Sequence, residues 1–204
     1  MQLKRFNIQL LFFLLFCFST IPSHSQNSSE HTFNAIQELD LDHLTEEDCY
    51  FLDSCLTLIQ PELEIQDKVK YYSPLYEKFL DLGRPLLAVS YINPLVEIYK
   101  ENDNKKDLAD LYSNKSLAHD FLGQYPEALI ASQKSLELYK ELKDKEGEAY
   151  AYNDIGIIHY YEGNDSLSQV YLDLSFVIYK ELNDTVGMAM YYINMANTLY
   201  EMEE

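Results

Sequence analysis

Apolar positions recur along most of the chain with the three- and four-residue spacing of amphipathic helices. The clearest stretch covers residues 148–162, and its apolar positions are Ala149, Tyr152, Gly156 and His159. Gly163 and Asn164 then end this helix, because glycine tolerates the left-handed backbone conformation that terminates helices. No strand-like alternation of useful length occurs in the sequence. The pattern therefore predicts an all-α fold.

A second helix is predicted after the turn at Gly163. It starts where Asp165 or Ser166 can cap its first turn, and it runs to about Leu182. A glycine precedes each of the following first helices, at Gly147 and Gly187. The sequence thus predicts pairs of helices joined by short turns.

Three sets of residues recur at a spacing of 40, which is the signature of a repeat protein. The sets are Tyr72, Tyr112, Tyr152 and Tyr192; Gly83, Gly123 and Gly163; and the Tyr-Lys-Glu sequences that begin at Tyr99, Tyr139 and Tyr179. Chance does not produce three independent series in one register, and we expect these tyrosines to lie in the core. The predicted repeats are 67–106, 107–146, 147–186 and an incomplete 187–204.

The repeats resemble the tetratricopeptide repeat (TPR) family, whose unit is a pair of helices. The first-helix signature positions hold Tyr152, Ile155, Gly156 and His159, and the small second-helix position holds Ala88 and Ala128. The period of 40 instead of about 34, and Ser168 in place of the usual alanine, are departures. They resemble the longer-helix subgroup of kinesin light chains, Rap-type regulators and bacterial extracytoplasmic sensors. The resemblance covers residues 67–204 and implies an α-α superhelical solenoid.

The N-terminal residues have a different pattern. Residues 1–25 contain Lys4 and Arg5, an apolar stretch and then the small residues Ser23 and Ser25. This order predicts a secretory signal peptide that is cleaved near Ser25, and therefore a periplasmic or otherwise exported protein. The apolar stretch is shorter than the roughly 20 residues that span a bilayer as a helix. An N-terminal membrane anchor, which is an uncleaved form of this segment, is the alternative and would be the chain's contact with a membrane.

Between the signal peptide and the repeats, two segments are predicted. Residues 26–43 are polar and lack periodicity, so we expect a flexible linker. Residues 44–66 are predicted to form an N-terminal capping helix or a degenerate repeat, with Thr45 as the cap. Cys49 and Cys55 would point apart on that helix, and we expect two thiols there instead of a disulfide.

The last predicted helix, within residues 187–204, has no second helix after it. Its apolar side chains are therefore expected to be partly exposed, and they are Tyr192, Met195, Ala196 and Leu199. Two alternatives follow: self-association through this uncapped helix, or a chain that is the front portion of a longer protein.

Charge and motifs exclude several functions. Fifteen Lys and Arg face 34 Asp and Glu, for a net charge of −19. Such a surface repels phosphate backbones, so nucleic acid is excluded as a partner. The sequence has no HExxH, phosphate-binding loop, GxSxG or CxxC motif, so we expect neither an enzyme nor a cofactor. His119 and His159 lie one repeat apart and are expected to pack in the core, with no bound metal.

One polar series has a sharper interpretation. Each first helix also has a small position, held by Ser116, Gly156 and Ala196, where we expect the neighbouring helix to approach closely. Asn114, Asp154 and Asn194 recur two residues before it. The resemblance implies that these helices line a concave face, where an asparagine amide hydrogen-bonds the backbone of an extended peptide. Asp154 departs from this pattern because an ionised carboxylate only accepts. Helical spacing adds further candidate peptide-binding residues, which are Asn153, Tyr150, Ile157 and Tyr160. The alternative is that these polar residues simply face water.

These observations predict a non-enzymatic module that binds a protein or peptide after export to the periplasm. The resemblance implies the sensory part of a signal-transduction regulator. An envelope assembly scaffold is a second hypothesis. A carbohydrate-binding protein is a third, based on Tyr150, Tyr160 and Tyr161, which lie outside the repeated tyrosine positions.

Overall fold

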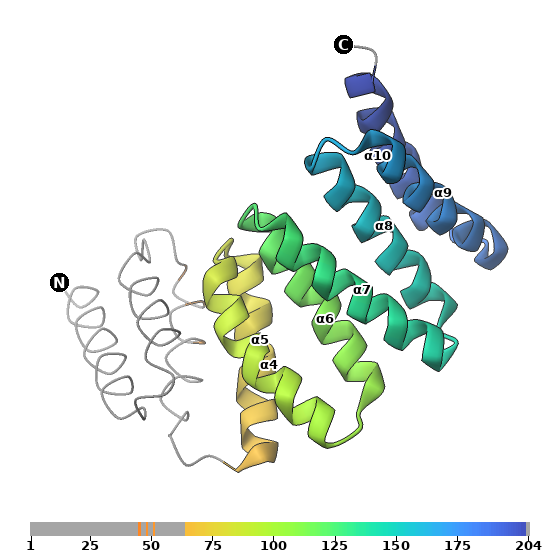
Figure 1. Cartoon of the computed structure of the whole chain (residues 1–204). Coiled ribbons are helices and arrows are strands. Elements are labelled where there is room, and N and C mark those ends of the chain that lie inside the picture. The colour runs from red at the N-terminus through yellow and green to blue at the C-terminus, as the bar shows by residue number, and fades with distance from the viewer. Residues whose placement is uncertain (1–44, 46–47, 49–50, 52–63, 203–204) are drawn as a thin grey trace. The chain divides into compact units, whose positions relative to one another are not determined.

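The computed structural model describes Thr45, Asp48, Phe51 and residues 64–202 (Figure 1). The predicted signal peptide, the linker, both mature cysteines and most of the predicted capping segment lie outside these residues. Every element in the described part is a helix, which confirms the all-α prediction. The chain divides into two compact units, Met1–Leu95 and Val96–Glu204, and each is described by itself.

Besides Thr45, Asp48 and Phe51, the described part of the first unit consists of α4 (Ile65–Asp81) and the first part of α5 (Pro85–Glu101). Both helices continue through an internal proline, Pro74 in α4 and Pro94 in α5, although a proline inside a helix lacks a backbone N–H donor and favours a kink. Tyr91 joins the two helices: its ring centroid lies 5.4 Å from that of Tyr72 and 5.6 Å from that of Phe79.

The predicted cap at Thr45 is present. Thr45 Oγ1 accepts a hydrogen bond from the Asp48 backbone N–H at 3.1 Å, and Asp48 Oδ2 accepts one from the Thr45 N–H at 3.0 Å. These reciprocal bonds form a capping box. The Asp48 carboxylate also forms an ion pair with Lys78 of α4. Lys78, and then Thr45, lower the pKa of Asp48 to about 2.

The second unit contains the end of α5 and five further helices. They are α6 (Lys105–Phe121), α7 (Tyr125–Leu142), α8 (Lys145–Tyr161), α9 (Asp165–Leu182) and α10 (Thr185–Met202). From α6 onward each helix packs on the next, and α8 also contacts α6 and α10 (Figure 1). This order of contacts is that of a solenoid of helical repeats, in which α6, α8 and α10 are first helices and α7 and α9 are second helices.

Two kinds of turn alternate in this unit. After a first helix the turn uses a left-handed glycine, Gly123 at φ 67° or Gly163 at φ 74°. After α9, Asn183 is left-handed at φ 55° and Asp184 caps α10 by accepting a hydrogen bond from the Gly187 N–H at 3.1 Å. The predicted caps of α9 are wrong, because its N-cap is Asn164, which makes no side-chain capping bond.

Gly147 and Gly187 lie inside the first turns of α8 and α10, although the sequence placed them before these helices. The ring of Tyr139 lies against Gly147, and the ring of Tyr179 lies against Gly187 in the same way. A Cβ atom at either glycine would overlap the ring. The glycines therefore permit close packing of a tyrosine, which is why they recur without acting as helix breakers.

The core of this unit is assembled from small and large residues in alternation. One cluster contains Ala109, Leu136, Tyr139, Ala151 and Ile155. At the small position, a Cβ on Gly156 would lie 2.9 Å from Leu172 Cγ, so glycine there allows the close helix approach that the sequence predicts. His159 is 8% exposed and stacks on Tyr171, which confirms a packing role.

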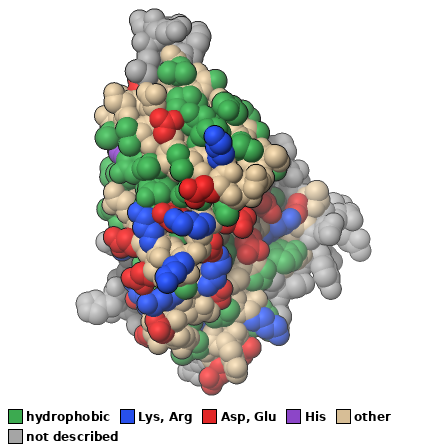
Figure 2. Space-filling model, turned by 90° about the vertical axis from the view of Figure 1, so that its right-hand side faces the viewer, with side chains coloured by type: hydrophobic (Ala, Val, Ile, Leu, Met, Phe, Trp, Pro, Cys, Tyr) green, Lys and Arg blue, Asp and Glu red, His purple; other side chains and the backbone are tan. Residues whose placement is uncertain are grey.

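The face of α10 that points away from α9 is apolar and exposed. Tyr192 is 61% exposed, Ile193 63% and Leu199 45%. The exposure of Leu199 and Tyr192 agrees with the uncapped-helix prediction, and Tyr192 thus departs from the core position of its register. Met195 is only 8% exposed, so its predicted exposure is wrong. Figure 2 shows apolar side chains gathered over the upper part of the surface.

Candidate functional site

Hydrogen bonds connect the three first helices of the second unit. Ser113 Oγ of α6 donates to Asp154 Oδ2 of α8 at 3.4 Å. Asn194 Nδ2 of α10 donates to Asn153 Oδ1 of α8 at 2.9 Å. In both bonds the two residues are 41 apart in sequence, so the same connection occurs twice, one repeat apart. We call Ser113, Asn114, Asn153, Asp154 and Asn194 the polar row.

The predicted binding residues of the polar row differ in accessibility. Asn114 and Asn194 are half-buried, and Asn114 Nδ2 donates to the Asp110 carbonyl of its own helix at 3.1 Å. Asn153 is 1% exposed and bonded to Asn194. Asn153 therefore holds Asn194 in place and does not itself face solvent.

Asp154 has an unusual environment for a carboxylate. Burial of the carboxyl group raises its pKa to about 7, the negative charge of Asp120 acts in the same direction, and hydrogen bonds from Ser113 and Asn153 act against it. Burial also raises the pKa of Asp120, whose buried Oδ1 has no hydrogen-bond partner within the described part of the chain. Near neutral pH the Asp154 side chain is thus present in both forms, as a donor when protonated and as an acceptor only when ionised.

The three remaining predicted residues of α8 do not form one pocket. Tyr150, Ile157 and Tyr160 are all half-buried. Tyr150 lies near the start of α8, with its ring edge-on to Tyr179 at 6.0 Å. Tyr160 lies about 15 Å further along the helix axis. Tyr150 and Tyr160 thus lie nearly three turns apart on α8, as their ten-residue spacing in one helix requires.

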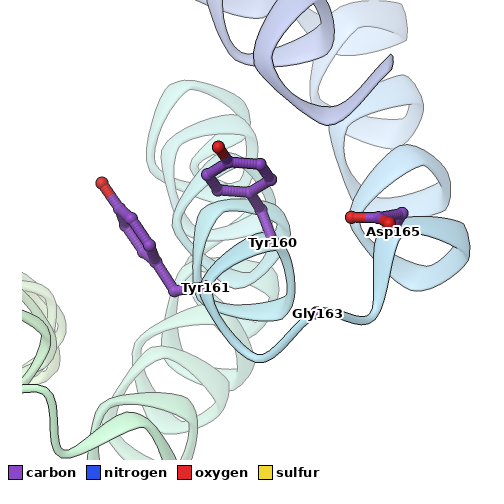
Figure 3. A pocket seen from close by; sticks show the side chains of 4 residues that line it. All are labelled: Tyr160, Tyr161, Gly163 and Asp165. Atoms are coloured by element: carbon purple, nitrogen blue, oxygen red, sulfur yellow. The ribbon is translucent and has the colours of Figure 1, made fainter. Parts of the chain in front are cut away.

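Tyr160 lines a hollow at the end of α8, with a volume of about 330 Å³. Its other lining residues are Tyr161, Gly163 and Asp165 (Figure 3). Tyr160 and Tyr161 project from α8, and Asp165 lies across from them at the start of α9. The Tyr161 ring is stacked on Tyr125 of α7 at 5.8 Å, so one of its faces is already covered, and it also lies 5.3 Å from the tilted ring of Tyr160.

A second feature was missed by sequence reasoning, and we call it the first tyrosine site: Lys106, Asp110, Tyr139 and Asp144. Tyr139 Oη donates to Asp110 Oδ1 at 2.7 Å. Lys106 Nζ donates to Asp144 Oδ2 at 2.5 Å and lies 4.9 Å from the centre of the Tyr139 ring. The site is thus filled by an ammonium group between a carboxylate and an aromatic face.

The residues 40 positions later form the second tyrosine site: Glu146, Tyr150, Tyr179 and Asp184. Tyr179 is 0% exposed, and its buried hydroxyl has no hydrogen-bond partner among the residues that the structure describes. The reason is that Tyr150 stands where Asp110 accepts the hydrogen bond in the first site. Aligning the repeats would have revealed this change, together with the replacement of Lys106 by Glu146.

The fold and these sites define a helical-repeat protein. Within the described residues, no group of three or more His, Cys, Asp or Glu side chains is placed to hold a metal ion. Among the described helices, none combines the length and apolar character needed to cross a bilayer. Comparison of the chain with known protein families and with characterised proteins gives no match.

Proposed function

We propose that this chain is a non-enzymatic binding module of the tetratricopeptide type, which holds an extended peptide along the polar row. The observation that carries the proposal is the repeated hydrogen-bonded connection between α6, α8 and α10. It aligns three polar side chains at one-repeat intervals on successive first helices: Asn114, Asp154 and Asn194.

The chemistry of the row suits a peptide backbone. An extended peptide presents N–H donors and C=O acceptors in alternation, and the amides of Asn114 and Asn194 offer both functions. The part-buried hydrogen bond between Asn194 and Asn153 fixes one of these amides, which lowers the entropy lost on binding. Asp154 accepts from peptide N–H groups when ionised and also donates when protonated.

The proposal extends to the cellular role. The signal-peptide pattern of residues 1–25 supports export to the periplasm. There the module would serve as the sensory part of a signal-transduction regulator, in line with the resemblance to exported TPR sensors. An envelope assembly scaffold is the alternative, and it would copurify with a stable partner.

Selection of random peptides displayed on phage, with the full chain immobilised, tests peptide binding. Selected peptides should bind about tenfold more weakly to the Asn114→Ala variant, because one hydrogen bond to the peptide backbone is lost. Gln133→Ala, at an exposed position of α7, is the matched control and should bind as the parent chain does. Failure to select any peptide, or equal binding by both variants, would contradict the proposal.

Carbohydrate binding is the second candidate function, and the hollow at Tyr160 and Tyr161 supports it. The remaining face of the exposed Tyr161 ring could stack on a sugar, with Asp165 as an acceptor for its hydroxyls. Soluble peptidoglycan fragments at 100 times their dissociation constant should then raise the free energy of unfolding by about 2.7 kcal/mol. Tyr161→Ala should abolish that increase, and no stabilisation of the parent chain would reject this function.

A further inference from the structure

The outer side of α9 carries a continuous apolar stripe. Its members follow one another at intervals of three, four and three residues, and they are Leu167, Val170, Leu174 and Val177. Each of these side chains is between 41% and 54% exposed. The buried residues of α9, which pack on α8 and α10, lie on the other side of the helix, so the stripe takes no part in that packing.

Helix α7 shows that a second helix of this fold does not require apolar residues at these positions. The residues one repeat earlier, all of them exposed, are Glu127, Ile130, Lys134 and Glu137. Three of the four positions are therefore charged in α7 and apolar in α9. Because α7 folds with charges there, the stripe of α9 is not needed for the fold, and a contiguous exposed apolar surface is typical of an interaction site.

The intervals within the stripe are those of the a and d positions of a helix that pairs with another helix. Intervals of three, four and three residues also read the same in both directions. An antiparallel copy of α9 consequently presents the matching pattern to the first one.

Two opposite charges lie along one flank of the stripe. Asp173 and Lys180 are seven residues apart, so they occupy the same heptad position. Asp173 Oδ1 accepts a hydrogen bond from Tyr191 Oη of α10 at 2.8 Å, which holds the carboxylate in place. Lys180 is exposed and forms no ion pair with a residue that the structure describes. The flank thus offers one acid and one base to a partner.

We propose that a second copy of this chain packs on the stripe, with its α9 antiparallel to the first. In a two-fold pair of antiparallel helices the same flank of each helix meets, and Leu174 of one copy lies beside Val177 of the other. In this register Asp173 of one copy and Lys180 of the second copy differ by about 3 Å along the helix axis. Two equivalent ion pairs form across the contact. Glu181 falls at its outer edge, where the carboxylate stays in water.

The charge distribution favours a second copy at this face. Two chains that each carry a net charge of −19 repel one another over most of their surface. The exposed residues of α9 from Ser166 to Lys180 include one acid and one base, so this face is locally neutral. Apolar burial drives the association, and the ion pairs determine its orientation. The inference is independent of the peptide site, which lies on the first helices.

Sedimentation equilibrium of the full chain over a range of concentrations tests the proposal, and the parent chain should form a dimer. Leu174→Lys introduces the residue that α7 carries as Lys134 and should raise the dimer dissociation constant at least about tenfold, because the contact would bury an ammonium group. Ile130→Lys makes the same kind of change on α7 and should leave the constant within about twofold. A monomeric parent chain, or equal effects of the two variants, would overturn the proposal.

Exchange of the two flanking charges tests the antiparallel arrangement. Lys180→Asp places a carboxylate opposite Asp173 of the second copy and should weaken the dimer about tenfold. Adding Asp173→Lys restores opposite charges and should return the dissociation constant to within about threefold of the parent value. Far-UV circular dichroism should be the same for all variants, which checks their folding. A double variant that associates as weakly as Lys180→Asp alone would overturn the proposed pair.

Discussion

Helices α8 and α10 carry the same repeat pattern in different surroundings. α8 packs against α7 and α9, whereas α10 packs on α9 with one face and leaves the other exposed. Positions in the same register consequently differ: Asn153 is 1% exposed and Ile193 is 63% exposed. The comparison teaches that the sequence pattern determines the helix, and the neighbouring helix determines how much each position stabilises the fold.

Truncation of core residues at the same register of α8 and α10 should give the largest difference in stability between the two helices. Ile155→Ala is expected to lower the free energy of unfolding by about 2–5 kcal/mol, because it opens a cavity between packed helices. Met195→Ala, in the same register of α10, should give a loss near the lower end, about 2 kcal/mol, because α10 contacts only α8 and α9 in the described chain, whereas α8 contacts α6, α7, α9 and α10. Urea denaturation measures both, and equal losses would contradict the comparison.

Asp154 and Asn194 occupy one register and differ in charge. The pKa of Asp154 is raised from 3.8 to about 7, so the folded chain holds a proton that the unfolded chain has released. The free energy of unfolding should therefore fall as the pH rises from about 4 to about 7. Asp154→Asn should remove this slope and raise stability at about pH 8 by about 2–4 kcal/mol.

Urea denaturation at a series of pH values checks the expected slope. The pKa of Asp120 is also raised by burial, so Asp120 contributes a pH dependence of the same sign in the parent chain and in the Asp154→Asn variant. Asn194→Asp, which places the same carboxyl group on the less covered helix, is the companion variant, and its slope should be smaller. An unchanged slope in Asp154→Asn would show that another group carries the pH dependence.

Substitution of the glycines that the Tyr139 and Tyr179 rings contact tests how far a local packing defect spreads through the helices. Gly147→Ala should cost about 1–3 kcal/mol, because its Cβ overlaps the Tyr139 ring. Gly187→Ala creates the same overlap with Tyr179, but its effect on hydrogen exchange should remain within α10. Val186→Ala, at an exposed neighbour, is the control and should leave exchange unchanged. Loss of protection in α8 on Gly187→Ala would show that the two helices unfold together.

The exposed face of α10 should give the smallest effect. Ile193→Ala is expected to change the free energy of unfolding by less than about 0.5 kcal/mol, as for other surface substitutions. Denaturation at several protein concentrations measures this change. A larger loss that grows with protein concentration would show that a second copy covers this face.

The all-α solenoid was predictable because its signals are local. Tyr152, Gly156 and Gly163 each report on a helix face or a turn within one repeat. The burial of Asn153 was not predictable in this way, because it depends on Asn194, 41 residues away. Gly147 was placed outside its helix for a similar reason: the ring that requires a glycine belongs to another helix.

The same distinction between local and long-range signals applies to the candidate site. Sequence spacing identified Asn114, Asp154 and Asn194 as one series, and the structure places them on three first helices, of which α8 contacts both α6 and α10. The unpartnered hydroxyl of Tyr179 depends on the replacement of one distant carboxylate by Tyr150. Contacts between side chains of different repeats could therefore not be predicted from the sequence and became apparent only in the structure.

The neighbour-to-neighbour order of contacts in the second unit also has a kinetic consequence. The principal contacts from α6 onward join helices that are adjacent in sequence or separated by one helix. Each such contact closes a short loop of chain, so little chain entropy is lost before stabilising contacts form. Proteins with such low contact order fold in microseconds to milliseconds, and a nucleus can form at any repeat and grow in either direction.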